Sequence, residues 1–201
     1  MMLANVKPAG LGSMPEVASM HAGAWFADLP EPLRVAIVAT ARVQQVRAGA
    51  VLARRGDAAA QWIGVASGAL RLGTALPDGR DFTLDFIGAS QWYGDIALID
   101  ERPNDLDVMA HVPSTVLLVP KVDLRGLVAR FDEFGAALLR LNCQRLRHML
   151  RRFEELQTLT LAARLARQLQ RLGKQFGRVQ DHGFVIEIGL SQADRAAMVG
   201  G

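Results

Sequence analysis

The sequence predicts an α+β protein in which short antiparallel strands are followed by a helical C-terminal third. Between about Val43 and Val119, six of the glycines recur at intervals of 6 to 12 residues, as turns do between short strands: Gly49, Gly56, Gly68, Gly79, Gly88 and Gly94. From about Val122 onward the apolar residues instead recur every three or four positions, which is the spacing of amphipathic helices. Many short strands at such intervals favour a β-sandwich or a small barrel over a parallel sheet.

The first expected elements are a helix and a β-hairpin. The segment Pro32–Ala41 carries proline in its first turn, a position that suits the start of a helix. The strands Leu70–Leu76 and Asp81–Ile87 flank Pro77–Arg80, an Asp-Gly-containing sequence typical of a hairpin turn. Strict alternation in the second strand predicts that Phe82, Leu84 and Phe86 share one face and that Asp81, Thr83 and Asp85 share the other. The segment Leu106–Val112 alternates in the same way.

A long helix is expected next, with an apolar stripe along it. The stripe steps by 4, 3, 4 and 3 residues, and we call it the α-seam: Leu139, Cys143, Leu146, Leu150 and Phe153. Such spacing is that of a coiled coil over about two heptads and predicts a homodimer. The alternative is a helix that packs on its own domain. The charged residues beside the stripe are expected to face water: Arg145, Arg147, Arg151, Arg152, Glu154 and Glu155.

The last segment predicts a second helix, a short strand and a third helix. Leucines at 161, 165, 169 and 172 form one stripe of the second helix, and Val185–Ile188 reads as a strand. Ser191 is expected to cap the helix Gln192–Val199, with Asp194 at the third helical position, as in a capping box.

Composition excludes several classes of protein. No uncharged stretch exceeds 13 residues, which is too short for a membrane-spanning helix. The first 20 residues lack the basic start and the apolar run of a signal peptide. Cys143 is the only cysteine, which excludes an internal disulfide, a multi-cysteine zinc site and a cysteine-ligated iron–sulfur cluster. We therefore expect a cytoplasmic protein with no membrane partner, no metal site and no enzymatic cofactor.

Positive charge is concentrated in the C-terminal third. Residues 1–129 carry 11 Lys or Arg against 13 Asp or Glu, whereas residues 130–201 carry 12 against 7. Nearly all of these cations are arginines, whose forked donors suit phosphate groups, so a nucleic acid is a candidate partner. A solvated, arginine-rich helix would explain the same charge.

Seven short motifs in this order resemble those of the CRP/FNR superfamily of bacterial transcription regulators. The match runs from about residue 25 to the C-terminus and rests on these segments: Phe26-Ala-Asp-Leu-Pro30, Ala48-Gly-Ala-Val-Leu52, Arg55-Gly-Asp57, Val65-Ala-Ser-Gly-Ala-Leu-Arg-Leu72, Trp92-Tyr-Gly-Asp-Ile-Ala-Leu98, Leu159-Thr-Leu-Ala-Ala-Arg-Leu-Ala166 and Leu190-Ser-Gln-Ala-Asp-Arg-Ala-Ala-Met-Val-Gly200. The resemblance implies an antiparallel β-roll (jelly-roll-like, a double-stranded β-helix) with flanking helices, a long dimerisation helix and a partial winged helix domain. The implied divisions are an N-terminal extension (1–24), a cyclic-nucleotide-binding-type sensor (25–130), the dimerisation helix (131–157) and the winged helix-turn-helix part (158–201).

The resemblance also implies a ligand pocket, from which this sequence departs. Gly94, Asp95, Ile96 and Ala97 occupy the positions of a Gly-Glu helix start, which in the family meets a cyclic phosphate and its ribose. The position of the phosphate-binding arginine falls near Asn104 or Asp105. Met149 and Leu150 stand where the cyclic-AMP receptor has hydroxyls that meet the base. The acidic surroundings would repel a phosphate, so we expect cyclic AMP to bind weakly or not at all, which leaves another ligand or a vestigial pocket.

For the C-terminal part, the resemblance implies DNA binding and a contact with RNA polymerase. Gln192–Val199 matches the first helix of a helix-turn-helix, and Ser191 and Gln192 are candidate phosphate contacts. The recognition helix is not present in these 201 residues, so we expect no reading of base sequence.

Three functions follow from these observations. The first is a DNA-binding transcription regulator of the CRP/FNR type, acting as a homodimer with an effector-sensing β-roll. The second is a stand-alone cyclic-nucleotide-type sensor without DNA-reading activity. The third, a cupin-type metalloenzyme, needs clustered His and carboxylate ligands that this sequence lacks, since His111 has no second ligand at suitable spacing.

Overall fold

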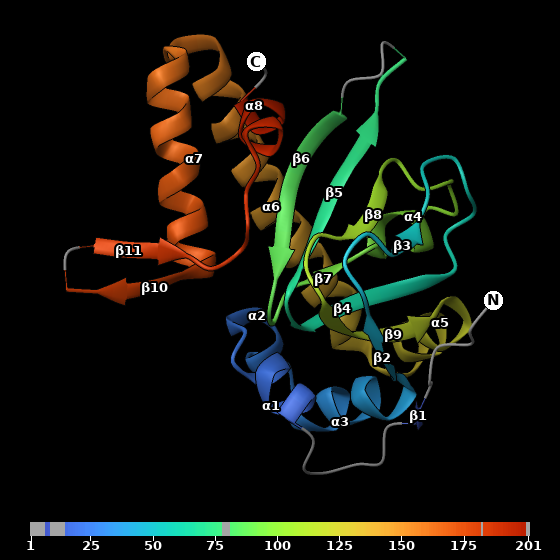
Figure 1. Ribbon diagram of the computed structural model, residues 1–201. Helices are drawn as coiled ribbons and strands as arrows, with labels where there is room; N and C mark the ends of the chain where they lie inside the picture. Colours follow the sequence, from blue (N-terminus) through green and yellow to red (C-terminus); the bar gives the residue numbers. More distant parts are fainter. Residues whose placement is uncertain (1–6, 9–14, 78–80, 182, 200–201) are drawn as a thin grey trace.

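Two antiparallel sheets form the centre of the molecule, and helices lie on either side of them along the chain (Figure 1). The computed structural model describes residues 7–8, 15–77, 81–181 and 183–199. The strands are β1 (Lys7–Pro8), β2 (Arg42–Val46), β3 (Val51–Ala53), β4 (Gln61–Ser67), β5 (Ala69–Ala75), β6 (Asp81–Gly88), β7 (Trp92–Tyr93), β8 (Asp107–Ala110), β9 (Ser114–Pro120), β10 (Gly177–Gln180) and β11 (Gly183–Ile186). The helices are α1 (Pro15–His21), α2 (Ala24–Ala27), α3 (Glu31–Thr40), α4 (Asp95–Ile99), α5 (Lys121–Arg130), α6 (Asp132–Thr158), α7 (Leu161–Phe176) and α8 (Gln192–Val199).

The β-roll consists of two facing sheets. In the described part of the chain, one sheet has the order β1-β2-β9-β4-β7 and the other the order β3-β8-β5-β6. Their interior is filled by aliphatic side chains of both sheets, among them Ile63 and Val65 from one and Leu70 and Val108 from the other. The predicted α+β class and the antiparallel β-roll with flanking helices are confirmed.

The predicted hairpin is present, but one part of its facing pattern is wrong. β5 and β6 pair with Ala75 opposite Asp81, and residues 78–80 of the predicted turn lie outside the described residues. The register shifts between Leu72 and Gly73, which pair with Asp85 and Thr83, so Leu84 has no partner in the ladder. Because such a bulge reverses which face the side chains on one side of it occupy, Thr83 is 1% exposed and Phe82 is 38% exposed.

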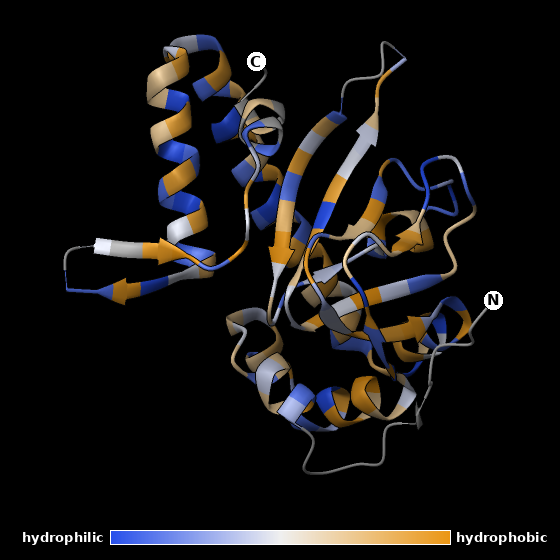
Figure 2. Ribbon diagram, in the orientation of Figure 1, coloured by the Kyte–Doolittle hydropathy of each residue, from blue (hydrophilic) through white to orange (hydrophobic). Residues whose placement is uncertain are grey.

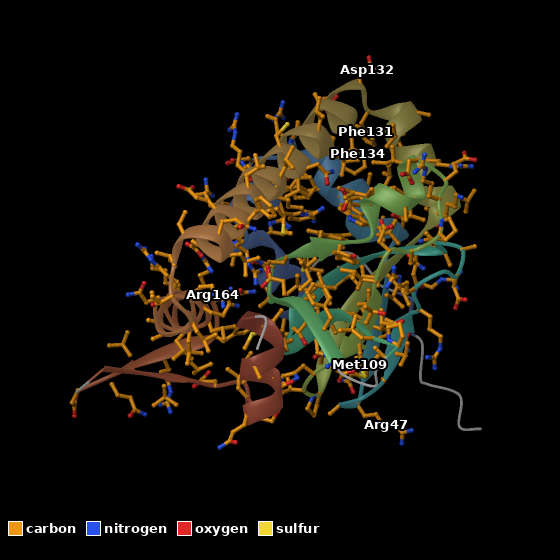
Figure 3. The ribbon with its side chains drawn as sticks, turned by 90° about the horizontal axis from the view of Figure 1, so that it is seen from above. Arg47, Met109, Phe131, Asp132, Phe134 and Arg164 are labelled. Atoms are coloured by element: carbon orange, nitrogen blue, oxygen red, sulfur yellow. The ribbon has the colours of Figure 1, made fainter. Side chains whose placement is uncertain are left out.

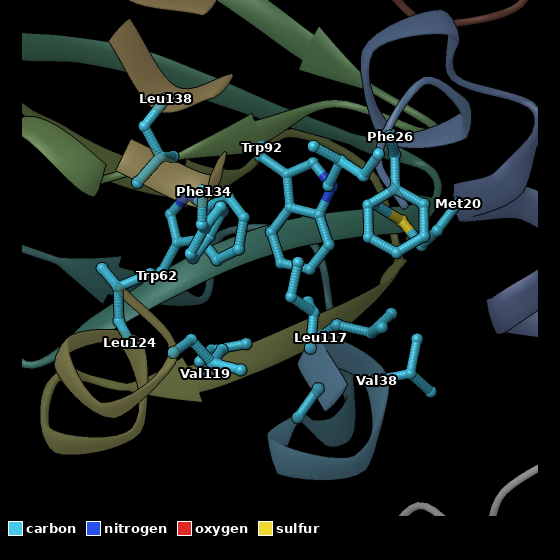
Figure 4. Close-up of a cluster of buried hydrophobic side chains, with 14 of the residues drawn as sticks. Met20, Phe26, Val38, Trp62, Trp92, Leu117, Val119, Leu124, Phe134 and Leu138 are labelled. Carbon is cyan, nitrogen blue, oxygen red and sulfur yellow. The ribbon is translucent and has the colours of Figure 1, made fainter. Parts of the chain in front are cut away.

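A cluster of aromatic side chains joins the first helices to the roll (Figure 4). The Trp62 and Trp92 rings stack with centroids 3.9 Å apart, and Phe26 and Phe134 pack beside them. Both tryptophans are buried core residues. Met20 of α1 is also buried in this cluster, so part of the expected N-terminal extension belongs to the core.

The beginning of the long helix α6 is buried against the roll. Phe134, Ala137 and Leu138 are buried against the roll, and the Trp25 indole donates a hydrogen bond of 3.0 Å to the Ala137 carbonyl. Figure 3 shows Phe131 and Phe134 at the beginning of α6, at the end opposite to α7. The first two turns of α6 therefore hold its beginning on the roll.

The C-terminal elements pack on the edge strand β6, with α8 between α7 and β6 (Figure 1). Phe86 of β6 forms a small core with Leu172, Ile188 and Met198, and Gly88 leaves the space that the Phe176 ring occupies. Polar and hydrophobic residues alternate along α7, as the leucine stripe predicted (Figure 2). The strand predicted at Val185–Ile188 lies at Gly183–Ile186 and pairs with β10.

Candidate functional site

The short helix α4 begins at Gly94, where the resemblance places the ligand. Gly94 has a left-handed backbone with φ of 95°, a conformation that glycine adopts without strain. This turn places the side chain of Asp95, the first residue of α4, in the interior, where it is 0% exposed. A carboxylate removed from water in this way requires a partner.

Two residues of α6 supply the partners of Asp95. The Arg145 guanidinium donates from Nη1 to Asp95 Oδ1 at 2.6 Å, and the Asn142 amide donates to Oδ2 at 2.6 Å. Arg145 also donates from Nη2 to the carbonyl of Trp92, at the end of β7. We call Asp95, Asn142 and Arg145 the α4–α6 polar cluster. It connects the turn before α4 to the middle of α6.

One interpretation of the sequence is corrected here. Arg145 does not face water, because its side chain is only 30% exposed and its guanidinium pairs with Asp95. Arg152 also points inward, lying 3.2 Å from Asp85 and only 12% exposed. The buried positions at the start of α6 continue at a spacing of three and four residues through 138, 142, 145, 148 and 152. Extending that stripe along the helix would have identified these arginines.

The other predicted pocket residues are dispersed. Ile96 is 52% exposed, and Ala97 is buried in the aromatic core. The Asn104 amide donates to the Asp57 carbonyl at 3.1 Å, which commits it to a loop contact. Asp105 is exposed, and Leu150 belongs to the α-seam. The structure therefore brings Asp95 together with Arg145 and Asn142, not with Asn104.

Tyr93 lies beside the α4–α6 polar cluster and packs against the interior of the roll. Burial of the phenol, together with the negative charge of Asp105, raises the pKa of Tyr93 to about 12, although Arg145 acts in the opposite direction. The hydroxyl is thus held neutral over the whole physiological range. It can donate or accept a hydrogen bond but supplies no charge to a ligand.

The α-seam is exposed along its whole length in the single chain. Leu139, Leu146, Leu150 and Phe153 are 59 to 66% exposed, and Cys143 is exposed as well. The opposite face of α6 carries the contacts to the roll. The alternative to dimerisation was that α6 packs on its own domain. In the structure this packing leaves the α-seam uncovered.

The start of α8 has the predicted capping box. The Asp194 backbone N–H donates to Ser191 Oγ at 3.0 Å, and the Ser191 backbone N–H donates to Asp194 Oδ2 at 2.8 Å. Burial alone would raise the pKa of Asp194. The hydrogen bonds from Ser191, together with the electrostatic effect of the nearby His111 and Arg71, lower this pKa below its usual value. Gln192 is exposed at the helix start, so its side chain is free to meet a partner.

Metal and membrane sites find no support in the described residues. These residues contain no group of three or more His, Cys, Asp or Glu side chains placed to hold a metal ion. His111 instead contacts the Gly189 carbonyl through Nε2 at 2.6 Å. None of the described helices combines the length and the apolar composition that crossing a bilayer requires.

Comparison with known proteins places this geometry in context. Residues 43–131 match the family model of the cyclic nucleotide-binding domain. The chain is 26% identical over 136 residues to a CRP-like cAMP-activated global transcriptional regulator of Mycobacterium tuberculosis. That alignment covers 68% of this chain and 61% of the relative, so the chain spans less than two thirds of the curated protein it matches.

Solved structures of other proteins share the fold. FixK2 from Bradyrhizobium japonicum superposes with a TM-score of 0.70 at 21% identity, covering 80% of this chain and 77% of that one. A CRP-family regulator from Thermus thermophilus gives a TM-score of 0.64 at 22% identity, covering 78% and 76%. At these sequence identities, the similarity shows a shared fold and nothing further about function.

Proposed function

We propose that this chain, with its cyclic nucleotide-binding β-roll followed by helices arranged as in CRP-type structures, is a DNA-binding transcription regulator that acts as a homodimer. The observation that carries the proposal is the match of residues 43–131 to the cyclic nucleotide-binding domain, joined to α6, α7 and α8 in one fold. The divisions implied by the resemblance, 25–130, 131–157 and 158–201, would then be sensor, dimerisation helix and DNA-binding part. RNA polymerase would be a further partner, and the cytoplasm its location.

Dimerisation is supported by the two faces of α6. One face holds the helix to the roll through Phe134 and Leu138, whereas the α-seam presents about two heptads of apolar residues to water. Two copies that pack seam against seam would form a self-complementary interface about a two-fold axis. This interface would exclude water from Leu146 and Leu150, and the roll would keep its position on α6.

The effector we propose is not cyclic AMP. A cyclic phosphate needs a positive partner, and the Arg145 fork is occupied by Asp95 and the Trp92 carbonyl. The position of the family's arginine falls near Asn104 or Asp105, so this part of the chain carries an amide and a negative charge instead of a cation. The residues at the start of α4 therefore do not fit the phosphate of a cyclic nucleotide.

DNA binding is supported by the arginine surplus and by the exposed start of α8. Residues 130–201 carry 12 Lys or Arg against 7 Asp or Glu, and phosphate contacts need only positioned positive charge and helix N-termini. Ser191 and Gln192 lie at that N-terminus. We propose that they approach the phosphate backbone.

The test is the salt dependence of DNA binding by the 201-residue chain. Gln192→Lys should add a phosphate contact and steepen the dependence of log affinity on log salt by about 0.9. Gln45→Lys, an exposed change on β2, adds the same charge away from α8 and should leave the slope unchanged. No DNA binding at low salt would favour the stand-alone sensor, and equal slopes for both variants would place the interface elsewhere.

A further inference from the structure

A cavity separate from the α4–α6 polar cluster lies between the roll and the C-terminal helices. Its volume is about 190 Å³, and its walls come from β6, α6, α7 and α8. The lining residues are Phe82, Thr83, Leu84, Met149, Arg152, Phe153, Glu155, Leu156, Arg164, Gln168, Arg171 and Met198. Of the eight predicted ligand-pocket residues, only Met149 belongs to it.

Most of the wall is apolar. Aromatic, leucine and methionine side chains form it, and the polar groups are contributed by β6, α6 and α7. Such a wall favours a hydrocarbon or aromatic body over water. An engineered apolar cavity of about 150 Å³ binds benzene, so this slightly larger space suits an aromatic ring that carries one small substituent.

Three polar atoms at the cavity are buried without a hydrogen-bond partner among the described residues. One of them, Arg152 Nη1, still lies 3.2 Å from the Asp85 carboxylate, and the other two belong to Thr83 and Arg164. Thr83 is 1% exposed, and its Oγ1 has no hydrogen-bond partner there. The Nε of Arg164 is also buried and lacks an acceptor in the same set of residues. Buried polar groups are nearly always hydrogen-bonded in folded proteins, so this pair indicates a missing acceptor.

The charges around the cavity leave one cation without a counter-charge. Arg152 lies 3.2 Å from Asp85, and Arg171 donates to Glu155. No carboxylate of the described residues lies within ion-pair distance of Arg164, which is on the side of α7 that faces the roll (Figure 3). The charged side chains around the cavity therefore have a net charge of one positive unit.

We propose that this cavity binds a small aromatic monocarboxylate of about the size of benzoate. The ring would lie against the apolar wall, and the carboxylate would accept from Arg164 Nε and Thr83 Oγ1. Because Arg164 belongs to α7 and Thr83 to β6, the ligand would connect the roll to the C-terminal helices. The site goes beyond the proposed DNA-binding function and can be tested without it.

The experiment is calorimetric titration of the whole chain with benzoate and with benzyl alcohol, its neutral counterpart of similar size. Benzoate should bind, and Arg164→Gln should weaken it about tenfold or more, the usual effect of losing a charge-assisted hydrogen bond. Benzyl alcohol should bind more weakly than benzoate and should not distinguish Arg164→Gln from the unchanged protein. Arg167→Gln, an exposed change on the same helix, should leave benzoate affinity as it is.

Two further variants keep the test decisive if Arg164→Gln does not fold. Thr83→Val preserves volume and removes only Oγ1, so it should weaken benzoate several-fold and spare benzyl alcohol. Met149→Trp fills the cavity from α6 and should abolish binding of both ligands. The proposal is overturned if benzoate gives no binding at millimolar concentration, if it binds no better than benzyl alcohol, or if Met149→Trp leaves its affinity intact.

Discussion

Removal of Arg145 should show how much the α4–α6 polar cluster contributes to the free energy of unfolding. Arg145→Met keeps much of the side-chain length but removes the guanidinium that pairs with Asp95. Asp95, which is 0% exposed in the unchanged protein, then keeps only the Asn142 amide as its partner. A buried carboxylate that loses its counter-charge is strongly destabilising, because water does not reach it.

The size of the effect follows from the unequal burial of the two partners. Breaking a buried ion pair from one side costs about 3–5 kcal/mol, and we expect the lower end because Arg145 is 30% exposed. Asp95→Asn should cost only about 1 kcal/mol, because the amide still accepts a hydrogen bond and the freed guanidinium can reach water. The double change, Asp95→Asn with Arg145→Met, should therefore be less destabilising than Arg145→Met alone.

Urea unfolding followed by tryptophan fluorescence measures these free energies, since Trp62 and Trp92 lie in the core beside the cluster. Arg147→Met, an exposed change on the same helix, is the matched control and should stay within about 0.5 kcal/mol of the unchanged protein. The reasoning is refuted if Arg145→Met is no more destabilising than Asp95→Asn, or than Arg147→Met.

Three other outcomes are expected. Calorimetry should show no micromolar binding of cyclic AMP, and Asp105→Arg should raise its affinity by supplying the missing cation; tight binding to the unchanged protein would contradict the site we describe. Tyr93, the only tyrosine, should ionise near pH 12 by ultraviolet titration of the folded protein, and its contribution to stability, complete below pH 10, should be lost as the pH rises toward 12. Because the pKa of Asp194 is lowered in the folded protein, its ionised carboxylate stabilises the fold at pH values above its ordinary pKa of 3.8. This stabilisation should disappear as the pH falls below 3.8. Ser191→Ala should make the free energy of unfolding depend less on pH in this acid range.

The order of helices and strands could be predicted from the sequence, because the spacing of apolar residues indicates which face of each element is buried. The alternation of β6 and the leucine stripe of α7 both predicted real elements. Alternation failed at Phe82 and Thr83, where a bulge opposite Leu72 and Gly73 reverses the two faces. A single inserted residue leaves no trace in the local pattern, because its effect depends on the partner strand.

The candidate site was harder to predict because its contacts join distant segments. Arg145 lies 50 residues from Asp95 along the chain, and its inward direction depends on how α6 packs on the roll. The cavity near Arg164 needs β6, α6, α7 and α8 together, and a chemically ordinary threonine, Thr83, contributes one of its polar atoms. Sequence spacing identifies motifs within one element, whereas these sites arise between elements.

The most direct test of the proposed regulator is its oligomeric state in solution. Sedimentation equilibrium at micromolar concentration should give a dimer for the unchanged chain, and a monomer for Leu146→Asp with Leu150→Asp, which places two carboxylates in the α-seam. Gln144→Asp with Arg151→Asp introduces the same groups at exposed positions beside the seam and should leave the dimer largely intact. A monomeric unchanged chain, or a Leu146→Asp and Leu150→Asp variant that remains a dimer, would contradict the account.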